Sequence, residues 1–159
     1  MNKFLFLIIA VLVFLAGCSS FGGDKETRKL VAKGLTPKTI YDQAEDMIDA
    51  GSIDQAIEQY QIILSSYPGS KYAIQARLDI AFNLYKRKKH SRAIVELDKF
   101  IEKYPDLQST PYAYYLRGVV AEDKSSSILD NLVTDSAQRD VDSVRKAYSY
   151  FVDLINTFP

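Results

Sequence analysis

The feature that most constrains the fold is a helical pattern that occurs three times in the chain. Each copy has a small residue, apolar residues at i+1, i+4, i+7, i+8 and i+11, and then a proline, and the copies begin at Ala56, Ala93 and Ala147. The spacing indicates one face of an amphipathic helix, and the proline indicates where that helix ends. The second copy follows the first by 37 residues in the same register. An internal repeat of this kind predicts a stack of similar helical units.

A second helix is predicted before each of these three. Pro37 and Pro111 fall near its first turn in repeats one and three, where a missing N–H costs no hydrogen bond. Gly51 falls where the first pair of helices must turn. The first helices also share a small residue, which lets the backbone of a partner helix approach closely; these residues are Ala44, Ala81 and Gly118. We therefore predict an all-α fold built from antiparallel helix hairpins.

The hairpin pattern resembles the tetratricopeptide repeat, which has small residues at fixed positions of both helices and a closing proline. This resemblance implies a superhelix of stacked hairpins over residues 36–159, with repeats at 36–69, 70–106 and 109–159. In repeat three, 29 residues separate the two small residues Gly118 and Ala147, against 12 between Ala44 and Ala56. We predict that the insert is a solvated loop at about 124–140 with some helix of its own.

The N-terminal segment has the pattern of an export signal. Lys3 precedes an apolar run of 13 residues from Phe4 to Ala16, which is shorter than the about 20 residues of a membrane-spanning helix. The only cysteine follows the run at Cys18, and the order Leu-Ala-Gly-Cys resembles the lipobox of bacterial lipoproteins. The resemblance implies a signal peptide at 1–17, lipidation of Cys18 and a flexible lipidated tether at 18–35. The alternative is a soluble secretory protein with an incidental thiol.

The composition excludes several classes of function. Lys and Arg total 20, as do Asp and Glu. The chain therefore has no surplus of positive charge that would favour binding of nucleic acid. One cysteine and one histidine exclude a disulfide framework and a Cys/His zinc site. There is no Gly-rich phosphate loop and no plausible catalytic set. We therefore expect a protein that acts by binding, without catalytic residues, metal or cofactor.

The residues as a set resemble the BamD family of outer-membrane lipoproteins. The most specific signs are the run Tyr115-Leu116-Arg117-Gly118 and a third repeat with an insert, both behind a lipobox. The resemblance implies attachment by lipid to the periplasmic face of the outer membrane. It implies partnership with a BamA-type β-barrel subunit and other assembly-machinery lipoproteins. The family resembles a five-repeat array whose last repeats dock BamA, so we expect this sequence to be a fragment with the substrate-recognition half.

The first helices of stacked hairpins line the concave side, which repeat proteins use as a groove. The groove predicted from the repeat register is aromatic, which suits an extended peptide with alternating apolar residues. The resemblance implies that its ligand is the C-terminal signal of unfolded outer-membrane proteins, which ends in an aromatic residue. The predicted groove residues are Tyr41, Glu45, Leu78, Phe82, Tyr85, Lys86, Tyr112, Tyr115, Val119 and Glu122. For Leu78 and Tyr115, packing between repeats is an equal alternative.

One basic run, residues 86–92, falls at the turn between the helices of repeat two. A solvated turn is the simplest interpretation, and an acidic partner surface or an anionic lipid surface are the alternatives. His90 lies in this run without partners for catalysis or metal binding, so we expect it on the surface. For the whole chain, the leading hypothesis is a scaffold lipoprotein of outer-membrane protein assembly. The alternative is a tetratricopeptide lipoprotein of another kind, such as a pilotin that escorts secretin subunits or another envelope scaffold.

Overall fold

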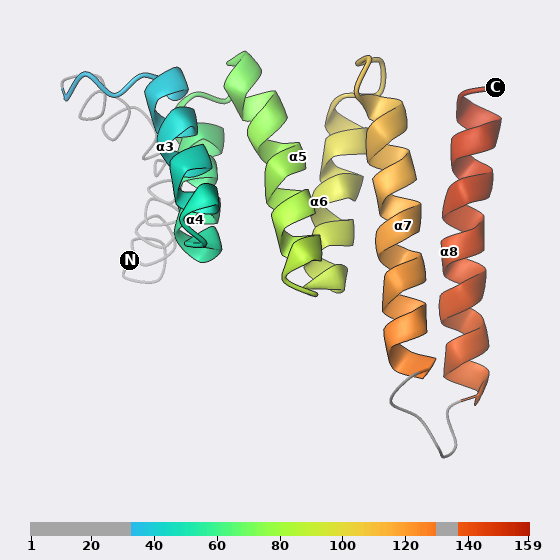
Figure 1. The fold of residues 1–159 in the computed structure, drawn as a ribbon. Helices are drawn as coiled ribbons and strands as arrows, with labels where there is room; N and C mark the ends of the chain where they lie inside the picture. The colour runs from blue at the N-terminus through green and yellow to red at the C-terminus, as the bar shows by residue number, and fades with distance from the viewer. Residues whose placement is uncertain (1–32, 130–136) are drawn as a thin grey trace, which may run out of the picture.

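The described part of the chain is a row of helices packed in chain order (Figure 1). The computed structural model describes residues 33–129 and 137–159, with the side chains of 126–141 outside the description. Each helix packs against the next one along the chain, and short turns make successive helices antiparallel. The described helices are α3 (Pro37–Asp49), α4 (Ile53–Ser66), α5 (Lys71–Lys86), α6 (His90–Lys103), α7 (Thr110–Leu129) and α8 (Ala137–Thr157). The predicted all-α stack of helix hairpins is confirmed.

Local signals in the sequence set the ends of the helices. Thr36 caps α3, since its hydroxyl accepts a hydrogen bond of 3.1 Å from the backbone N–H of Thr39. Ser70 caps α5 in the same way, with a bond of 3.1 Å from Ala73. Gly51 turns the first hairpin with a φ of +78°, a conformation that favours glycine. The prolines that close the repeats follow α4, α6 and α8 within two residues, as predicted.

A continuous apolar core runs through the hairpins. It is built from the repeated face of the second helices, with Tyr60, Ile63, Leu97 and Phe100 fully buried. The predicted small residues lie inside it: Ala44 and Ala81 are buried, and Gly118 lies under the ring of Phe151. The repeat pattern therefore marks the positions where neighbouring helices meet.

The third hairpin differs from the prediction in the length of its helices. Both helices extend into the segment predicted as a loop, because α7 continues to Leu129 and α8 begins at Ala137. Only 130–136 separates them, and it lies outside the described residues. In α8 the predicted apolar face is covered in part, since Tyr148 is 70% exposed and Ile155 is 66% exposed. The equivalent residues of α4 are covered by the following hairpin, whereas within the described part of the chain α7 is the only helix whose backbone lies close to that of α8.

Candidate functional site

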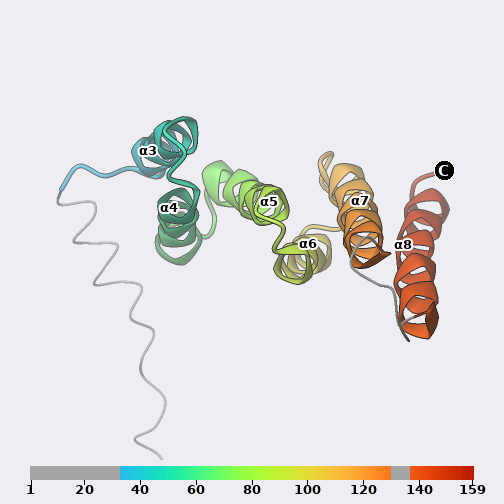
Figure 2. The same ribbon diagram turned by 60° about the horizontal axis from the view of Figure 1, so that its bottom comes forward.

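The first helices of the hairpins, α3, α5 and α7, form one side of the row, and α4, α6 and α8 form the other (Figure 2). We call the first side the A face. The backbone of α5 lies close to those of both α3 and α7, whereas within the described residues the backbones of α4, α6 and α8 do not approach one another in this way. Close approach on one side and separation on the other bends the row toward the A face. The A face is therefore the inner, concave side, where repeat proteins carry their binding surfaces.

A stripe of side chains along α5 forms the middle of the A face. It consists of residues spaced by three or four, which places them on one side of the helix; they are Lys71, Gln75, Asp79, Phe82 and Lys86. Phe82 is 41% exposed, and its ring centroid lies 6.5 Å from that of the half-buried Tyr85. The stripe thus combines a large exposed apolar side chain with polar groups on both sides of it.

Asp79 is the centre of a hydrogen-bond network that joins α3 to α5. The hydroxyl of Tyr41 donates to one carboxylate oxygen at 2.6 Å, and the amide of Gln75 donates to the other at 3.0 Å. The ring of Tyr41 also packs between those of Tyr60 and Tyr72, each centroid 5.5 Å away. Because both oxygens of Asp79 have donors and its tyrosine partner is packed on two sides, this part of the face is held rigid.

Glu45 makes a parallel contact within the first hairpin. Its carboxylate accepts a hydrogen bond from the hydroxyl of the buried Tyr60. Burial, followed by the bonds to carboxylates, raises the pKa of both Tyr41 and Tyr60 above the usual tyrosine range. Burial also raises the pKa of the Asp79 carboxyl, against the effect of its two hydrogen-bond donors, and nearby Glu45 adds to the rise. The tyrosines therefore stay protonated as donors at neutral pH.

Exposed aromatic side chains continue the A face from α5 onto α7. Tyr112 is 47% exposed and Tyr115 is 51% exposed. Burial raises the pKa of Tyr112, and the charge of Asp79 raises it further. The ring of Tyr115 lies 6.4 Å from that of Phe151 on α8. The exposed rings of Phe82, Tyr112 and Tyr115 form what we call the aromatic face.

The remaining predicted groove residues divide by exposure. Glu45, Lys86 and Glu122 are exposed, and Val119 is half-buried. Leu78 is a correction, because it is 5% exposed and belongs to the core, so it offers no surface to a ligand. Apolar side chains at the contact between neighbouring helices are withdrawn from solvent even when their register is that of the concave face.

Asp79 is the residue that sequence reasoning missed. A lone aspartate in an amphipathic helix is usually a solvated surface residue, so its type alone gives no signal. The available signal was its register, four residues after Gln75 and three before Phe82 on the same stripe. A hollow of about 420 Å³ lies at the Gln75 end of the stripe, bordered also by Lys71, Ile74 and Leu107. The stripe on α5 thus has a polar centre and a hollow at one end.

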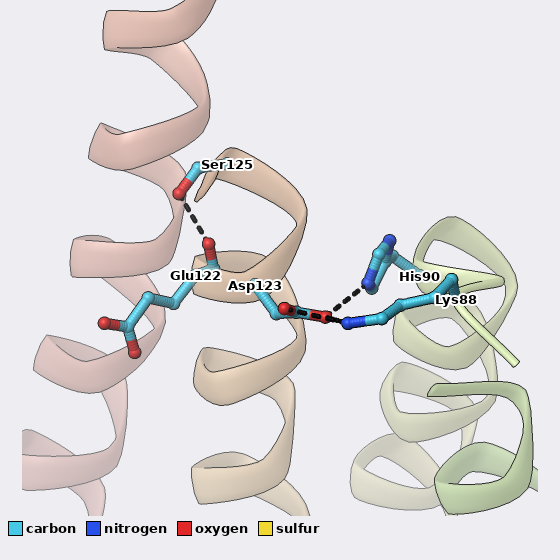
Figure 3. A network of polar contacts seen from close by, with 5 residues as sticks. All are labelled: Lys88, His90, Glu122, Asp123 and Ser125. Carbon is cyan, nitrogen blue, oxygen red and sulfur yellow. Dashed lines mark hydrogen bonds and ion pairs between the residues drawn. The ribbon is translucent and has the colours of Figure 1, made fainter. Parts of the chain in front are cut away.

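His90 is the second correction, because it is buried and not on the surface. Its Nε2 lies 2.7 Å from a carboxylate oxygen of Asp123 on α7, and the ammonium of Lys88 lies 2.9 Å from the same carboxylate (Figure 3). The ring of Tyr85 packs at 6.2 Å from His90. Ser125 donates to the backbone carbonyl of Glu122 one turn further along α7. The contacts of His90 and Lys88 with Asp123 hold the turn between α5 and α6 against α7, so their role is structural.

Other basic residues of the same turn are also paired. Arg87 lies 3.0 Å from the carboxylate of Asp54 on α4, and Lys89 lies 3.1 Å from the other oxygen of that carboxylate. These bonds lower the pKa of the Asp54 carboxyl, and the hydrogen bond from Lys89 has the largest influence. The basic run is thus partly neutralised by the hairpins on each side and does not form a uniform basic patch.

The lipidation site predicted at Cys18 lies outside the described residues, as do the signal peptide and the tether up to residue 32. Within the described ranges, no helix combines the length and the hydropathy that a membrane span requires. The same ranges hold no cluster of three or more His, Cys, Asp or Glu side chains suited to a metal ion.

Comparison with known proteins identifies the family of this chain. The profile of a family described as "YfiO: Outer membrane lipoprotein" matches residues 33–159, which include every described helix. The chain belongs to the YfiO family. Its relatives include proteins named "Outer membrane protein assembly factor BamD", so the resemblance to the BamD family is confirmed.

Three YfiO-family relatives show how much of those proteins the chain represents. The BamD of Neisseria meningitidis serogroup B is 30% identical over 159 residues, which are 99% of this chain and 59% of the relative. The BamD of Xylella fastidiosa strain Temecula1 is 28% identical, covering 96% of this chain and 51% of the relative. The BamD of Haemophilus influenzae is 28% identical, with 96% and 56% covered. The chain therefore spans about half the length of the curated relatives it matches.

Proposed function

We propose that the chain acts in outer-membrane protein assembly by binding unfolded outer-membrane proteins on its aromatic face. The observation that carries the proposal is the exposure of Phe82, Tyr112 and Tyr115 on adjacent helices of the concave side. Aromatic residues that are 41% to 51% exposed gain free energy when an apolar segment covers them. The relatives are named as outer-membrane protein assembly factors, and unfolded chains with such apolar segments occur in that process.

The geometry favours an extended segment as the ligand. The stripe on α5 follows the helix axis, and Asp79 holds its centre rigid through Tyr41 and Gln75. A strand-like peptide with alternating apolar residues can place its side chains on successive rings while its backbone stays hydrated. The side-chain amide of Asn83 is buried and donates to the backbone carbonyl of Asp79 at 2.8 Å. The aromatic side chain of a C-terminal signal, more than its carboxylate, is the part that this face would recognise.

The proposal extends to location and mode of action. Lipidation of Cys18 would hold the helical row at the periplasmic face of the outer membrane, with residues 18–35 as the tether. The protein would act without catalysis, as a scaffold beside a BamA-type subunit and other assembly lipoproteins. Replacement of Cys18 by alanine should then abolish palmitate labelling and release the exported protein from membranes. Equal labelling of the variant would contradict the anchor.

Photo-crosslinking tests the binding face directly. A photoreactive amino acid at Phe82 or Tyr112 should capture a labelled peptide that ends in phenylalanine and copies the end of a barrel protein. The matched control is Val95 on α6, which is 49% exposed on the opposite side of the row. Yields at Phe82 and Tyr112 well above the yield at Val95 would support the proposal, and equal yields would overturn it. Co-purification of a secretin in place of a barrel subunit would favour the pilotin alternative.

A further inference from the structure

A separate cavity lies on the side of the row opposite the aromatic face. Its volume is about 400 Å³, and it is lined by side chains from three helices, α6, α7 and α8. From α7 it receives Ala121 and Lys124. Ala121 is nine residues after Tyr112, which is two and a half helical turns, so the two residues point to opposite sides of α7. A ligand in this cavity cannot touch the aromatic face.

The cavity has an apolar floor and a polar rim. Ile94 of α6, Ala121 of α7 and Tyr150 of α8 pack together at its base. Ser91, Lys124 and Lys146 contribute hydroxyl and ammonium groups around them. An apolar base with a few convergent polar groups is the usual composition of a ligand site in proteins.

The two rim lysines have no carboxylate partner among the side chains that the structure describes. Lys124 donates to the hydroxyl of Ser91 at 3.1 Å, and the ammonium of Lys146 lies 5.4 Å from the centre of the Tyr150 ring. Asp142 also lines the cavity, but its carboxylate already accepts a bond of 2.9 Å from Arg145. The rim therefore offers two cationic groups to an anion.

The floor is held in place before any ligand binds. Tyr150 is 8% exposed, and the guanidinium of Arg117 stacks on its ring at 4.2 Å. Arg117 is itself fixed by Asp98 on α6 at 2.9 Å and by Asp153 on α8 at 3.4 Å. A preformed floor lowers the entropy cost of binding, since no side chain has to be ordered.

We propose that this cavity is a docking site for an acidic peptide segment of a partner protein. An apolar side chain of the segment sits on Ile94 and Tyr150, and a neighbouring carboxylate lies between Lys124 and Lys146. The cavity volume suits one or two side chains. A membrane surface would need a broad basic face, whereas the nearby Arg87 and Lys89 are already paired with Asp54. Charge complementarity therefore favours the acidic peptide.

Fluorescence anisotropy with the full chain in detergent tests this site. The probe is a short labelled peptide that alternates phenylalanine with glutamate, and the comparison peptide has glutamine at every glutamate position. The variant is Lys124→Glu with Lys146→Glu. The matched control is Lys99→Glu with Lys103→Glu, because both lysines are exposed on α6 outside the cavity lining and the total charge change is the same.

The expected result is tighter binding of the glutamate peptide than of the glutamine peptide. The cavity variant should lose about tenfold in affinity, and the control variant should keep the affinity of the parent protein. Equal affinity for both peptides, or an equal loss in both variants, would overturn the proposal. If anionic vesicles bind the parent protein but not the cavity variant, and the peptide binds neither, then the cavity binds a lipid surface and the peptide proposal is overturned. The same comparison is made in a protein with alanine at Phe82 and Tyr112, so that the aromatic face does not hold the phenylalanines of the probe; the loss of about tenfold in the cavity variant should persist there, which separates the two sites.

Discussion

Single residues show how tightly the hairpins are fitted together. A Cβ atom on Gly118 would lie 2.5 Å from the ring of Phe151, so only glycine allows α7 and α8 to approach as they do. Gly51 and Lys88 occupy equivalent turns one repeat apart, with φ of +78° and +56°. At the second turn a lysine accepts the left-handed conformation that glycine adopts without strain, and its ammonium reaches Asp123. The repeat thus preserves the turn geometry while the residue changes.

We predict that Gly118→Ala lowers the free energy of unfolding by about 1 to 3 kcal/mol, because the ring of Phe151 has to move. Urea denaturation measures the effect. Gly69→Ala is the control, since a Cβ there has no neighbour within 4 Å, and its change should stay within about 0.5 kcal/mol. Combining Gly118→Ala with Phe151→Leu should recover part of the loss. If both glycine variants cost the same, close helix packing is not the reason for Gly118.

Asp79 and Asp123 should affect stability with opposite dependence on pH. Bonds from Lys88 and His90 lower the pKa of the Asp123 carboxyl, so its stabilisation is present above the unfolded value of about 3.9 and disappears in acid. Burial raises the pKa of the Asp79 carboxyl. Its contribution to the free energy of unfolding is therefore most favourable below the pKa of the unfolded state, and it weakens as the pH rises through the pKa of the folded state.

Urea denaturation from about pH 7 to about pH 3 compares the two aspartates. The loss of stability in Asp123→Asn should be largest at neutral pH and shrink in acid. The unfolding free energy of Asp79→Asn relative to wild type should change in the opposite direction, so that the asparagine variant is relatively more stable at neutral pH than in acid. Parallel changes in both variants would contradict the assigned causes of the two pKa shifts.

At the scale of helices, Arg117 connects the elements of the third hairpin to the second. It is buried, it stacks on Tyr150 of α8, and its guanidinium lies 4.9 Å from the ring centre of Tyr114. Its ion pairs reach Asp98 on α6 and Asp153 on α8. A planar guanidinium can stack on rings and bind two carboxylates at once, which an ammonium cannot do. Arg117 and Gly118, two residues of the run on which the family resemblance was based, therefore have a packing explanation.

We predict that Arg117→Lys keeps the charge but costs about 1 to 2 kcal/mol of unfolding free energy, because the stacked geometry is lost. Arg145→Lys is the control, since Arg145 forms an exposed pair with Asp142 on the same helix. Its effect should be about 0.5 kcal/mol or less. Thermal and urea unfolding check both variants. Equal stability of the two would show that charge alone explains Arg117.

At the scale of the whole molecule, the row is packed unevenly. The inner helices have neighbours on two sides, since α6 contacts both α5 and α7. In the described part of the chain α8 packs mainly on α7, and Val144, Tyr148 and Ile155 are exposed. Stability in repeat arrays comes from nearest-neighbour contacts, so a helix with one neighbour opens more easily.

We predict that the amides of residues 144–158 exchange with solvent faster than those of residues 93–104. Hydrogen exchange followed by mass spectrometry on a dilute monomer measures the difference. A sample shown to be monomeric in which α8 and α6 are equally protected would contradict the prediction. If α8 becomes protected only at higher protein concentration, its exposed apolar side chains mediate self-association.

The sequence by itself determined the helical elements and their order. Prolines and apolar spacing act within a few residues, so they predicted the starts of α3 and α7, the ends of α4 and α6, and the buried faces of the first two hairpins. The same local signals located the aromatic residues of the A face. These features could be predicted because each depends on chain neighbours one or two helical turns apart.

Only the tertiary structure decided which of those residues reach solvent or one another. Leu78 and Phe82 have similar register on α5, but one is buried by neighbouring helices and the other is exposed. The contacts of His90 with Asp123, and of Asp79 with Tyr41, join residues 33 and 38 positions apart. Such pairs depend on how separate helices are placed in space, and no spacing along the chain encodes that placement.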